Sequence, residues 1–433
     1  MITKQKGTYD ILPEEARNWV KLEAILRNIC KIYNYEEIRT PVFEASELFH
    51  RTVGESSDIV SKETYTFKDR SDRSITLRPE GTAGVVRAYI ENKLYKDGNL
   101  QKLFYINNSF RYERPQKGRQ RQFHQFGIEA LNSDSPFLDA EIILLGVTVI
   151  RSLGLKGVKV RINSIGDLES RAKYKEELVK YFNNFKSDLC GDCLSRLEKN
   201  PLRILDCKVD NKKEYFNNVP KITDYLNEES KSHFNKVLAA LDNAKVEYEI
   251  NPFLVRGLDY YSHTVFEIEA AIEGFGSQNV LAGGGRYDGL VESLDGPKTS
   301  SVGMAFGMER LLLALESEGK KLVKEKSNHL YVIALGDEAI LAATNIVNNS
   351  RMKGLITEMD YQSKSMKAQF KQSDKYNSKY IAILGETELK ENKINVKNVE
   401  TQEQVTINID ELVEYIINDI NGKSNCGSCG GCK

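Results

Sequence analysis

Apolar residues along the chain recur at two spacings, and these spacings predict where helices and strands lie. Residues 14–33 have apolar side chains at roughly helical spacing, which predicts a long helix: Val20, Leu22, Ile25, Leu26 and Ile29. Residues 104–131 instead contain two segments rich in Phe, Tyr and Ile around the sequence ERPQKGRQ. Because Pro115 and Gly118 interrupt a strand there, the pattern predicts a β-hairpin with a long basic loop.

The rest of the pattern up to about residue 325 mixes strands, helices and one charged helical stretch. Pro41 ends a short strand that a helix follows, and Pro79 is expected in the first turn of another helix. The other expected elements are strands over 74–77, 158–166, 264–270 and 300–307, and helices over 139–153 and from about Gly307. Residues 167–244 are helical and charged without a catalytic signature, which predicts an insertion domain beside the catalytic sheet.

From His329 onward, strands and helices alternate. The expected strands cover 329–336, 355–361, 379–385, 394–401 and 402–409, and the expected helices cover 337–353, 365–376 and 410–420. This alternation predicts a separate small α/β domain with a mixed sheet.

Side-chain alternation along the hairpin predicts one polar face and one apolar face. On the polar face we expect Arg111 and Glu113 from the first strand and Phe123, Gln125 and Glu129 from the second. The loop adds four cations: Arg114, Lys117, Arg119 and Arg121. The arrangement suits a polyanionic ligand with a cationic or polar companion, and a solvated hairpin with a charged exposed face is the alternative.

Composition limits the classes of protein that the chain can represent. Its 433 residues are enough for about two to four domains. With 28 % charged residues and a net charge of −1, any nucleic acid must bind local basic patches. The sequence has no long apolar run and no apolar signal region at its start, so we expect a cytoplasmic protein without a membrane span.

The seven cysteines do not resemble a disulfide framework in a chain of this length, so reduced thiols are expected. Cys190, Cys193 and Cys207 have the spacing of half a zinc site, and His233 is the only nearby candidate for a fourth ligand. Buried or free thiols are the favoured interpretation, and no metal ligand is predicted. Three more cysteines lie in the Gly- and Ser-rich end, where we expect a flexible tail: Cys426, Cys429 and Cys432.

Several segments together resemble one enzyme family. The hairpin sequence FRYERPQKGRQRQFHQFGIE resembles motif 2 of the class II aminoacyl-tRNA synthetases, and specifically that of the histidyl enzymes. Similar resemblances are found in KGTYDILPEEA, LRPEGT, RGLDYY, VLAGGGRYDGL and SSVGMAFGMERLLLALES, the last of these being like motif 3. The segment YEEIRTPVFEASELFHRTVGE resembles motif 1, which builds the class II dimer interface. The resemblance covers residues 4–420.

The resemblance implies a fold and a domain organisation. The fold class is α/β (α+β), with a class II antiparallel-sheet catalytic core over residues 1–325 that contains the helical insertion at about 167–244. An anticodon-binding α/β domain with a mixed sheet follows over 329–421, and a flexible Cys-rich tail over 422–433.

The resemblance also implies an activity, histidine–tRNA ligase. Such an enzyme activates L-histidine with ATP to histidyl-adenylate and then transfers the histidyl group to the 3′ end of tRNA(His). The implied cofactor is Mg²⁺, which would bridge the β- and γ-phosphates of ATP, and the implied assembly is a homodimer.

Site residues follow from the matched motifs. Arg111 and Arg256 are the implied catalytic cations at the α-phosphate, where the planar fork of Arg contacts two oxygens. The implied histidine-binding residues are Glu80, Thr82, Arg111, Gln125, Glu129, Arg256, Tyr260 and Tyr261. The implied ATP-binding residues are Arg111, Glu113, Arg119, Phe123 and Arg310. The implied tRNA acceptor contacts are Arg114, Gln116 and Lys117. A carboxylate and a phenol, Glu129 and Tyr261, suit the two nitrogens of an imidazole.

Alternatives to these roles exist. Glu80 fits an ordinary carboxylate at a helix start, and the tyrosine pair fits core packing. For the whole chain, one alternative is a synthetase-like regulatory subunit of histidine biosynthesis, and another is a binding or sensor module without catalysis. Arg256, the intact hairpin loop and residues 329–421 argue against the regulatory subunit.

Overall fold

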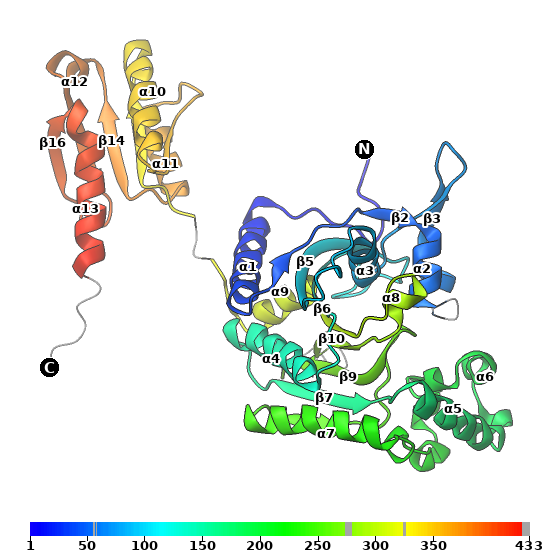
Figure 1. The fold of residues 1–433 in the computed structure, drawn as a ribbon. Coiled ribbons are helices and arrows are strands. Elements are labelled where there is room, and N and C mark those ends of the chain that lie inside the picture. Colours follow the sequence, from blue (N-terminus) through cyan, green and yellow to red (C-terminus); the bar gives the residue numbers. More distant parts are fainter. Residues whose placement is uncertain (55–56, 58, 273–278, 324–325, 427–433) are drawn as a thin grey trace. The chain divides into compact units, whose positions relative to one another are not determined.

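The computed structural model describes residues 1–54, 57, 59–272, 279–323 and 326–426, and the chain divides into two compact units. The first unit spans Met1–Val323 and the second Lys324–Lys433 (Figure 1). Each has its own hydrophobic core.

An eight-stranded sheet forms the centre of the first unit. Its strand order is β1-β5-β6-β11-β10-β9-β7-β8. The strands are β1 (Glu36–Glu37), β5 (Gln101–Phe110), β6 (Gln122–Leu131), β7 (Lys159–Ser164), β8 (Tyr248–Ile250), β9 (Ser262–Glu269), β10 (Val280–Arg286) and β11 (Ser301–Gly307). Neighbours are antiparallel except at the two edges, where β1 runs parallel to β5 and β8 parallel to β7. The predicted fold class, with a largely antiparallel catalytic sheet, is confirmed.

Helices cover one face of this sheet and leave the other for the site. The covering helices are α1 (Pro13–Ile32), α4 (Pro136–Ser152), α7 (Glu228–Asn243) and α9 (Met308–Ser317). Phe126 and Ile128 of β6 are fully buried in the core that these helices share with the sheet. Because side chains alternate along a strand, Phe123, Gln125 and Glu129 project from the opposite face.

A smaller sheet and two helices lie beside the hairpin. They are β2 (Phe43–Ala45), β3 (Tyr65–Lys68), β4 (Ser74–Leu77), α2 (Ser46–Val53) and α3 (Thr82–Glu91), and a four-residue helix, α8 (Leu290–Ser293), lies near β10. The prediction that Pro79 opens a helix was wrong, because α3 begins at Thr82. The Glu80 carboxylate accepts hydrogen bonds from the amides of Thr82 and Ala83 at 2.6 and 2.8 Å and so fixes the helix start.

The expected insertion has a hydrophobic cluster of its own, which runs from Tyr174 to Leu226. It contains α5 (Leu168–Asn183), α6 (Gly191–Lys199) and several short 3₁₀ turns. The last helix of the predicted insertion, α7, packs on the core of the sheet through Phe234, Val237 and Leu241. The separately packed segment is therefore shorter than the predicted 167–244.

The second unit contains a five-stranded mixed sheet in the order β13-β12-β14-β15-β16. Its strands are β12 (Leu330–Ala334), β13 (Thr357–Met359), β14 (Tyr380–Leu384), β15 (Lys393–Asn398) and β16 (Gln404–Asn408). Its helices are α10 (Asp337–Met352), α11 (Met366–Lys375), α12 (Glu386–Glu391) and α13 (Leu412–Cys426). The predicted mixed α/β domain is present, and α12 is an unpredicted addition.

The predicted flexible tail begins inside a helix, since α13 continues to Cys426. Cys429 and Cys432 lie outside the described residues. Over the described part of the chain, we find no helix with both the length and the apolar character needed to cross a membrane.

Candidate active site

A pocket of about 730 Å³ lies on the sheet face that the helices leave open. The predicted site residues that line it are Glu80, Thr82, Arg111, Glu113, Gln116, Arg119, Phe123, Gln125, Glu129, Arg256, Tyr260, Tyr261 and Arg310. Arg114 and Lys117 are exposed on the hairpin loop and are not part of this lining. The tertiary structure thus brings residues from four separate segments of the chain to one cavity.

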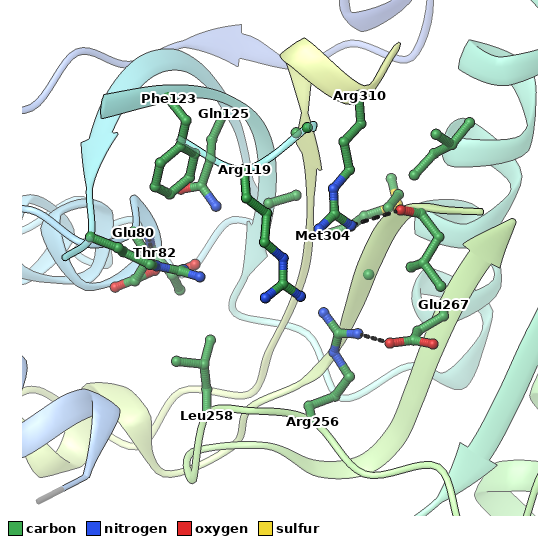
Figure 2. Close-up of a pocket in the computed structure, with 18 of the residues that line it drawn as sticks. Glu80, Thr82, Arg119, Phe123, Gln125, Arg256, Leu258, Glu267, Met304 and Arg310 are labelled. Carbon is green, nitrogen blue, oxygen red and sulfur yellow. Dashed lines mark hydrogen bonds and ion pairs between the residues drawn. The ribbon is translucent and has the colours of Figure 1, made fainter. Parts of the chain in front are cut away.

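Five arginines line the pocket, and four of them are predicted site residues: Arg111, Arg119, Arg256 and Arg310. The fifth, Arg161 of β7, forms an ion pair with Glu269 at 3.0 Å. Figure 2 shows the side chains of Arg119, Arg256 and Arg310 extending into the same space. Burial and then the nearby charge of Arg119 lower the pKa of Arg310, which indicates that these cations lie close together. A polyanion bound here would relieve this repulsion.

Arg111 lies just beyond the end of its strand. The prediction that Arg111 and Glu113 belong to the first hairpin strand was wrong, since β5 ends at Phe110. The Tyr112 amide donates to the carbonyl of Glu63 at 2.7 Å, which draws the chain away from β6. The Arg111 guanidinium donates to the carbonyl of Pro79 at 2.9 Å, and its centre lies 5.3 Å from the Phe123 ring. Arg111 is therefore anchored through Nε, while the other N–H groups of its guanidinium remain available to a ligand.

Arg256 is held by an acidic partner and accommodated by a glycine. It forms an ion pair with Glu267 of β9 (Figure 2). Burial alone would lower the pKa of Arg256, but the charge of Glu267 raises it, so the side chain stays a cation. A Cβ atom on Gly283 of β10 would lie 2.2 Å from Nη2 of Arg256, so only glycine leaves room for the guanidinium there.

Glu129 lies at the floor of the pocket among three hydroxyl donors. Thr82 Oγ1 donates to Oε1 of Glu129 at 2.7 Å, Tyr105 OH donates to Oε1 at 3.2 Å, and Tyr287 OH donates to Oε2 at 2.5 Å. Burial raises the pKa of Glu129 to about 8 despite these donors, so the carboxyl is largely protonated near neutral pH. A Cβ on Gly303 would lie 1.9 Å from Oε2 of Glu129, so this neighbour must also be glycine.

Glu80 and Thr82 lie on the side of the pocket opposite Arg310 and Glu267 (Figure 2). Glu80 is only 3 % exposed, and burial raises its pKa. Its oxygens already accept the two amides at the start of α3, as the alternative interpretation of Glu80 requires. Each carboxylate oxygen has a second lone pair, however, so the group can still accept a proton donor from the pocket.

Two tyrosines that border Glu129 were not identified from the sequence. Tyr105 lies on the same face of β5 as Ser109, and Tyr287 follows the glycine run of β10. The strand alternation that selected Arg111 also selects Tyr105, and the motif VLAGGGRYDGL contains Tyr287, so both signals were present. The predicted Tyr261 packs against Tyr260 with ring centroids 4.7 Å apart.

His233 contacts neither the cysteines nor the pocket. Its Nε2 lies 2.9 Å from Oδ2 of Asp139, and Asp139 also pairs with the fully buried Arg286. The suggestion of His233 as a fourth ligand beside Cys190 and Cys193 was wrong, because its imidazole contacts Asp139 instead.

Comparisons with known proteins point to one family. A family model described as histidyl-tRNA synthetase matches residues 7–311, and one described as an anticodon binding domain matches residues 329–419. A curated relative from Bacillus velezensis named histidine–tRNA ligase is 52 % identical over 412 residues, which cover 95 % of this chain and 97 % of the relative.

Solved structures give the same result. The chain is similar to apo histidyl-tRNA synthetase from S. aureus, with a TM-score of 0.83, 44 % identity, and coverage of 96 % of this chain and 100 % of that one. A structure titled as an ATP phosphoribosyltransferase regulatory subunit/histidyl-tRNA synthetase from Bacillus halodurans is similar at a TM-score of 0.63 and 20 % identity. It covers 89 % of this chain and 98 % of that one, and at this identity the likeness concerns the fold alone.

Proposed function

Because this chain belongs to the histidyl-tRNA synthetase family and is a histidine–tRNA ligase, we propose that its pocket activates histidine with ATP. The observation that carries this proposal is the convergence of four arginines beside a buried carboxyl surrounded by hydroxyl groups. The arginines suit a triphosphate, and the carboxyl with its phenols suits an imidazole. ATP, histidine and tRNA are accordingly the substrates.

In the activation step, the histidine carboxylate attacks the α-phosphorus of ATP, and diphosphate leaves. Arg111 and Arg256 would stabilise the negative charge that develops on the α-phosphoryl oxygens, since both are anchored cations in the pocket. Phe123 would stack on adenine, and Arg310 would contact the γ-phosphate. Arg119 would add charge near the β- and γ-phosphates.

At the amino-acid end, Glu80 and Thr82 would accept the α-ammonium, and Gln125 would help to orient it. Glu129 and Tyr261 would contact the imidazole nitrogens, with Tyr260 closing the pocket. The hydrogen bonds from Tyr105 and Tyr287 fix Glu129, which supports a specific orientation of the ring. A site that hydrogen-bonds both nitrogens would reject apolar analogues strongly.

Mg²⁺ is implied by the use of ATP. Glu113 fits such an ion because it is a pocket carboxylate close to Arg119, at 3.3 Å, where phosphates would lie. When bound, Mg²⁺ would neutralise and orient the β- and γ-phosphates.

For the transfer step, we propose that tRNA contacts both units. Arg114, Gln116 and Lys117 on the hairpin loop would contact the acceptor end and so would bring its 3′ hydroxyl to the histidyl group. Residues 329–421 would bind the anticodon, in line with the anticodon-binding model that matches 329–419. We further propose a cytoplasmic location, where translation uses the product.

A homodimer is also proposed. Three apolar side chains of the small sheet region are exposed: Val42 (43 %) and Phe43 (55 %) within the motif 1 segment, and Phe67 (49 %) on β3. Burial of such side chains against a second copy would be favourable. Analytical ultracentrifugation tests this proposal, and a monomer at micromolar concentration would overturn it.

The experiment that tests the activation proposal is histidine-dependent exchange between ATP and labelled diphosphate. Arg256→His should abolish exchange, while Arg51→His, at a surface ion pair with Asp295, should leave it intact. Charging of bulk tRNA with each amino acid in turn should give a product with histidine alone. Near-normal exchange by Arg256→His would contradict the role assigned to Arg256, and no exchange by the unmodified enzyme would contradict the function.

A further inference from the structure

The insertion contains a cluster of sulfur and oxygen atoms that the reaction does not use. The side chains of Cys190, Cys193, Cys207 and Asp210 each present one ligand atom, and these atoms lie within 4.8 Å of one another. Asp210, Cys193 and Cys207 are buried, and Cys190 is partly exposed. The thiols are free, so no disulfide joins them.

The geometry fits a single tetrahedral ion. Two sulfurs bound to one zinc ion at ~2.3 Å each are separated by ~3.8 Å when the coordination is tetrahedral. Cys190 Sγ and Cys207 Sγ are 3.7 Å apart. That distance is far too long for a disulfide bond, at ~2.05 Å.

The sequence spacing is symmetric around this cluster. Cys190 and Cys193 are separated by two residues, and so are Cys207 and Asp210. Cys190 is the N-cap of α6 and Cys193 lies in its first turn, while Asp210 starts a 3₁₀ turn. Two short turns that face each other, each with two ligands, are typical of structural zinc sites.

Groups around the four side chains support the same assignment. The amide of Asp210 donates to Cys207 Sγ at 3.3 Å, and the amide of Cys190 donates to Asp210 Oδ2 at 3.1 Å. Lys213 Nζ lies 2.7 Å from Asp210 Oδ1. Such donors orient the ligands and offset the negative charge of three thiolates and a carboxylate around a divalent ion.

We propose that Cys190, Cys193, Cys207 and Asp210 form a structural site for one Zn²⁺ ion. Four protein ligands close the coordination sphere, so the ion has a structural and not a catalytic function. The segment packs around a small hydrophobic cluster of its own, and a cluster of that size contributes little stability by itself. A bound metal ion would supply additional stability.

The site also affects the active pocket through its position in the chain. Between the two ligand pairs, Asn200 Nδ2 donates to Asp259 Oδ1 at 2.9 Å, and Arg203 Nη1 donates to the carbonyl of Arg256 at 3.0 Å. Asp206 and Lys208, which flank Cys207, line the pocket itself. The ion would therefore hold the segment that supports the backbone of Arg256.

Metal analysis of the full-length enzyme, purified with reductant and without chelator, tests the site. To limit thiol ligands to the proposed site, the background is a variant in which Cys426, Cys429 and Cys432 are all serine. We expect about one zinc per chain in this background. Cys193→Ser and Cys207→Ser should lose it, and Cys30→Ser, a buried thiol of α1, should retain it.

Cobalt provides a second readout that does not depend on expression of the cysteine variants. Reconstitution with Co²⁺ should give the intense visible bands of a tetrahedral thiolate site. Asp210→Asn should alter those bands and release zinc to a chelator at least 10-fold faster. Three results would each overturn the proposal. The background protein contains no zinc as purified and binds no Co²⁺, Cys190 and Cys207 form a disulfide instead of a metal site, or Asp210→Asn leaves the Co²⁺ spectrum unchanged.

Discussion

At the residue scale, Gly283 controls whether Arg256 can occupy the pocket. Gly283→Ala would place a Cβ 2.2 Å from the guanidinium of Arg256, so the side chain must move away. Because an error of ~1 Å in a positioned group can reduce turnover ~100-fold, we expect a loss of roughly that size in kcat for diphosphate exchange.

The control for Gly283→Ala is Gly422→Ala, since a Cβ on that helical glycine meets nothing within 4 Å. Fluorescence of the single tryptophan, Trp19 in α1, checks that both variants keep a folded catalytic unit. Unchanged exchange in Gly283→Ala would mean that the position of Arg256 does not limit the chemical step.

Also at the residue scale, Glu129 should make stability depend on pH. Its pKa rises from an ordinary value of 4.5 to about 8 on folding, so the folded state binds the proton more tightly than the unfolded state. The contribution of this proton to stability is complete below about pH 4.5 and is lost as the pH rises through about 8. The free energy of unfolding should therefore fall across this window, by at most about 1.4 kcal/mol per pH unit from this group.

Glu129→Gln tests that expectation, because the amide keeps the shape of the protonated acid. Denaturant unfolding followed by Trp19 fluorescence, at pH 5, 6, 7 and 8, should give a flatter pH dependence for the variant than for the unmodified chain. Equal slopes for the two proteins would show that Glu129 ionises normally in the folded state.

At the element scale, different residues of the hairpin loop are expected to contact ATP and tRNA. Arg114 and Lys117 are exposed and lie outside the pocket lining, whereas Arg119 on the same loop is part of it. Joint replacement of Arg114 and Lys117 by Ala should leave diphosphate exchange near normal. The KM for tRNA should rise roughly tenfold, since lost phosphate contacts of about 1.4 kcal/mol have that effect.

The salt dependence of tRNA binding supplies the matching check for the loop. Removal of two phosphate contacts should reduce the slope of log affinity against log salt by roughly two units. Lys93→Ala, at a residue just after α3, is the control and should not change the slope. A double variant with normal charging kinetics would exclude the loop from tRNA binding.

At the scale of the whole molecule, the two compact units should divide the reaction. The first unit, 1–323, has its own core and contains the whole pocket lining. A protein ending at residue 323 should retain exchange within a few-fold and lose at least ~10-fold in charging efficiency, because anticodon contacts contribute to tRNA affinity alone.

Circular dichroism and Trp19 fluorescence check that this shortened protein is folded. If it charges tRNA as efficiently as the full chain, residues 329–421 do not bind the anticodon. If it is folded but fails in exchange as well, activation depends on the second unit.

The local pattern of apolar and polar residues was sufficient to predict most helices and strands, but it did not predict where they end. Alternation along β6 predicted that Phe123, Gln125 and Glu129 share a face. In the structure, Phe126 and Ile128 on the opposite face are buried in the hydrophobic core. The end of β5 was misplaced because a distant group sets it, and the start of α3 was misplaced because a neighbouring side chain caps the helix. The Tyr112 amide donates a hydrogen bond to the carbonyl of Glu63, which is far away in the sequence. The Glu80 carboxylate caps the N-terminus of α3.

The cysteine cluster shows the same limit. The spacing of Cys190, Cys193 and Cys207 is visible in the sequence, but His233 was the only candidate that the sequence offered for a fourth member. Asp residues are common and mostly exposed, so nothing local distinguished Asp210 until folding buried it beside three thiols.

The sequence by itself determined the family, the two-unit order and most of the side chains in the pocket, because motif residues and hydrophobic periodicity are local properties of the chain. Only the tertiary structure decided that Glu129 is held by Tyr105 and Tyr287, that glycines at 283 and 303 make room for the side chains of Arg256 and Glu129, and that Asp210 joins the cysteines. These features depend on distances between segments far apart in sequence, and such distances are set when the sheet and the insertion pack.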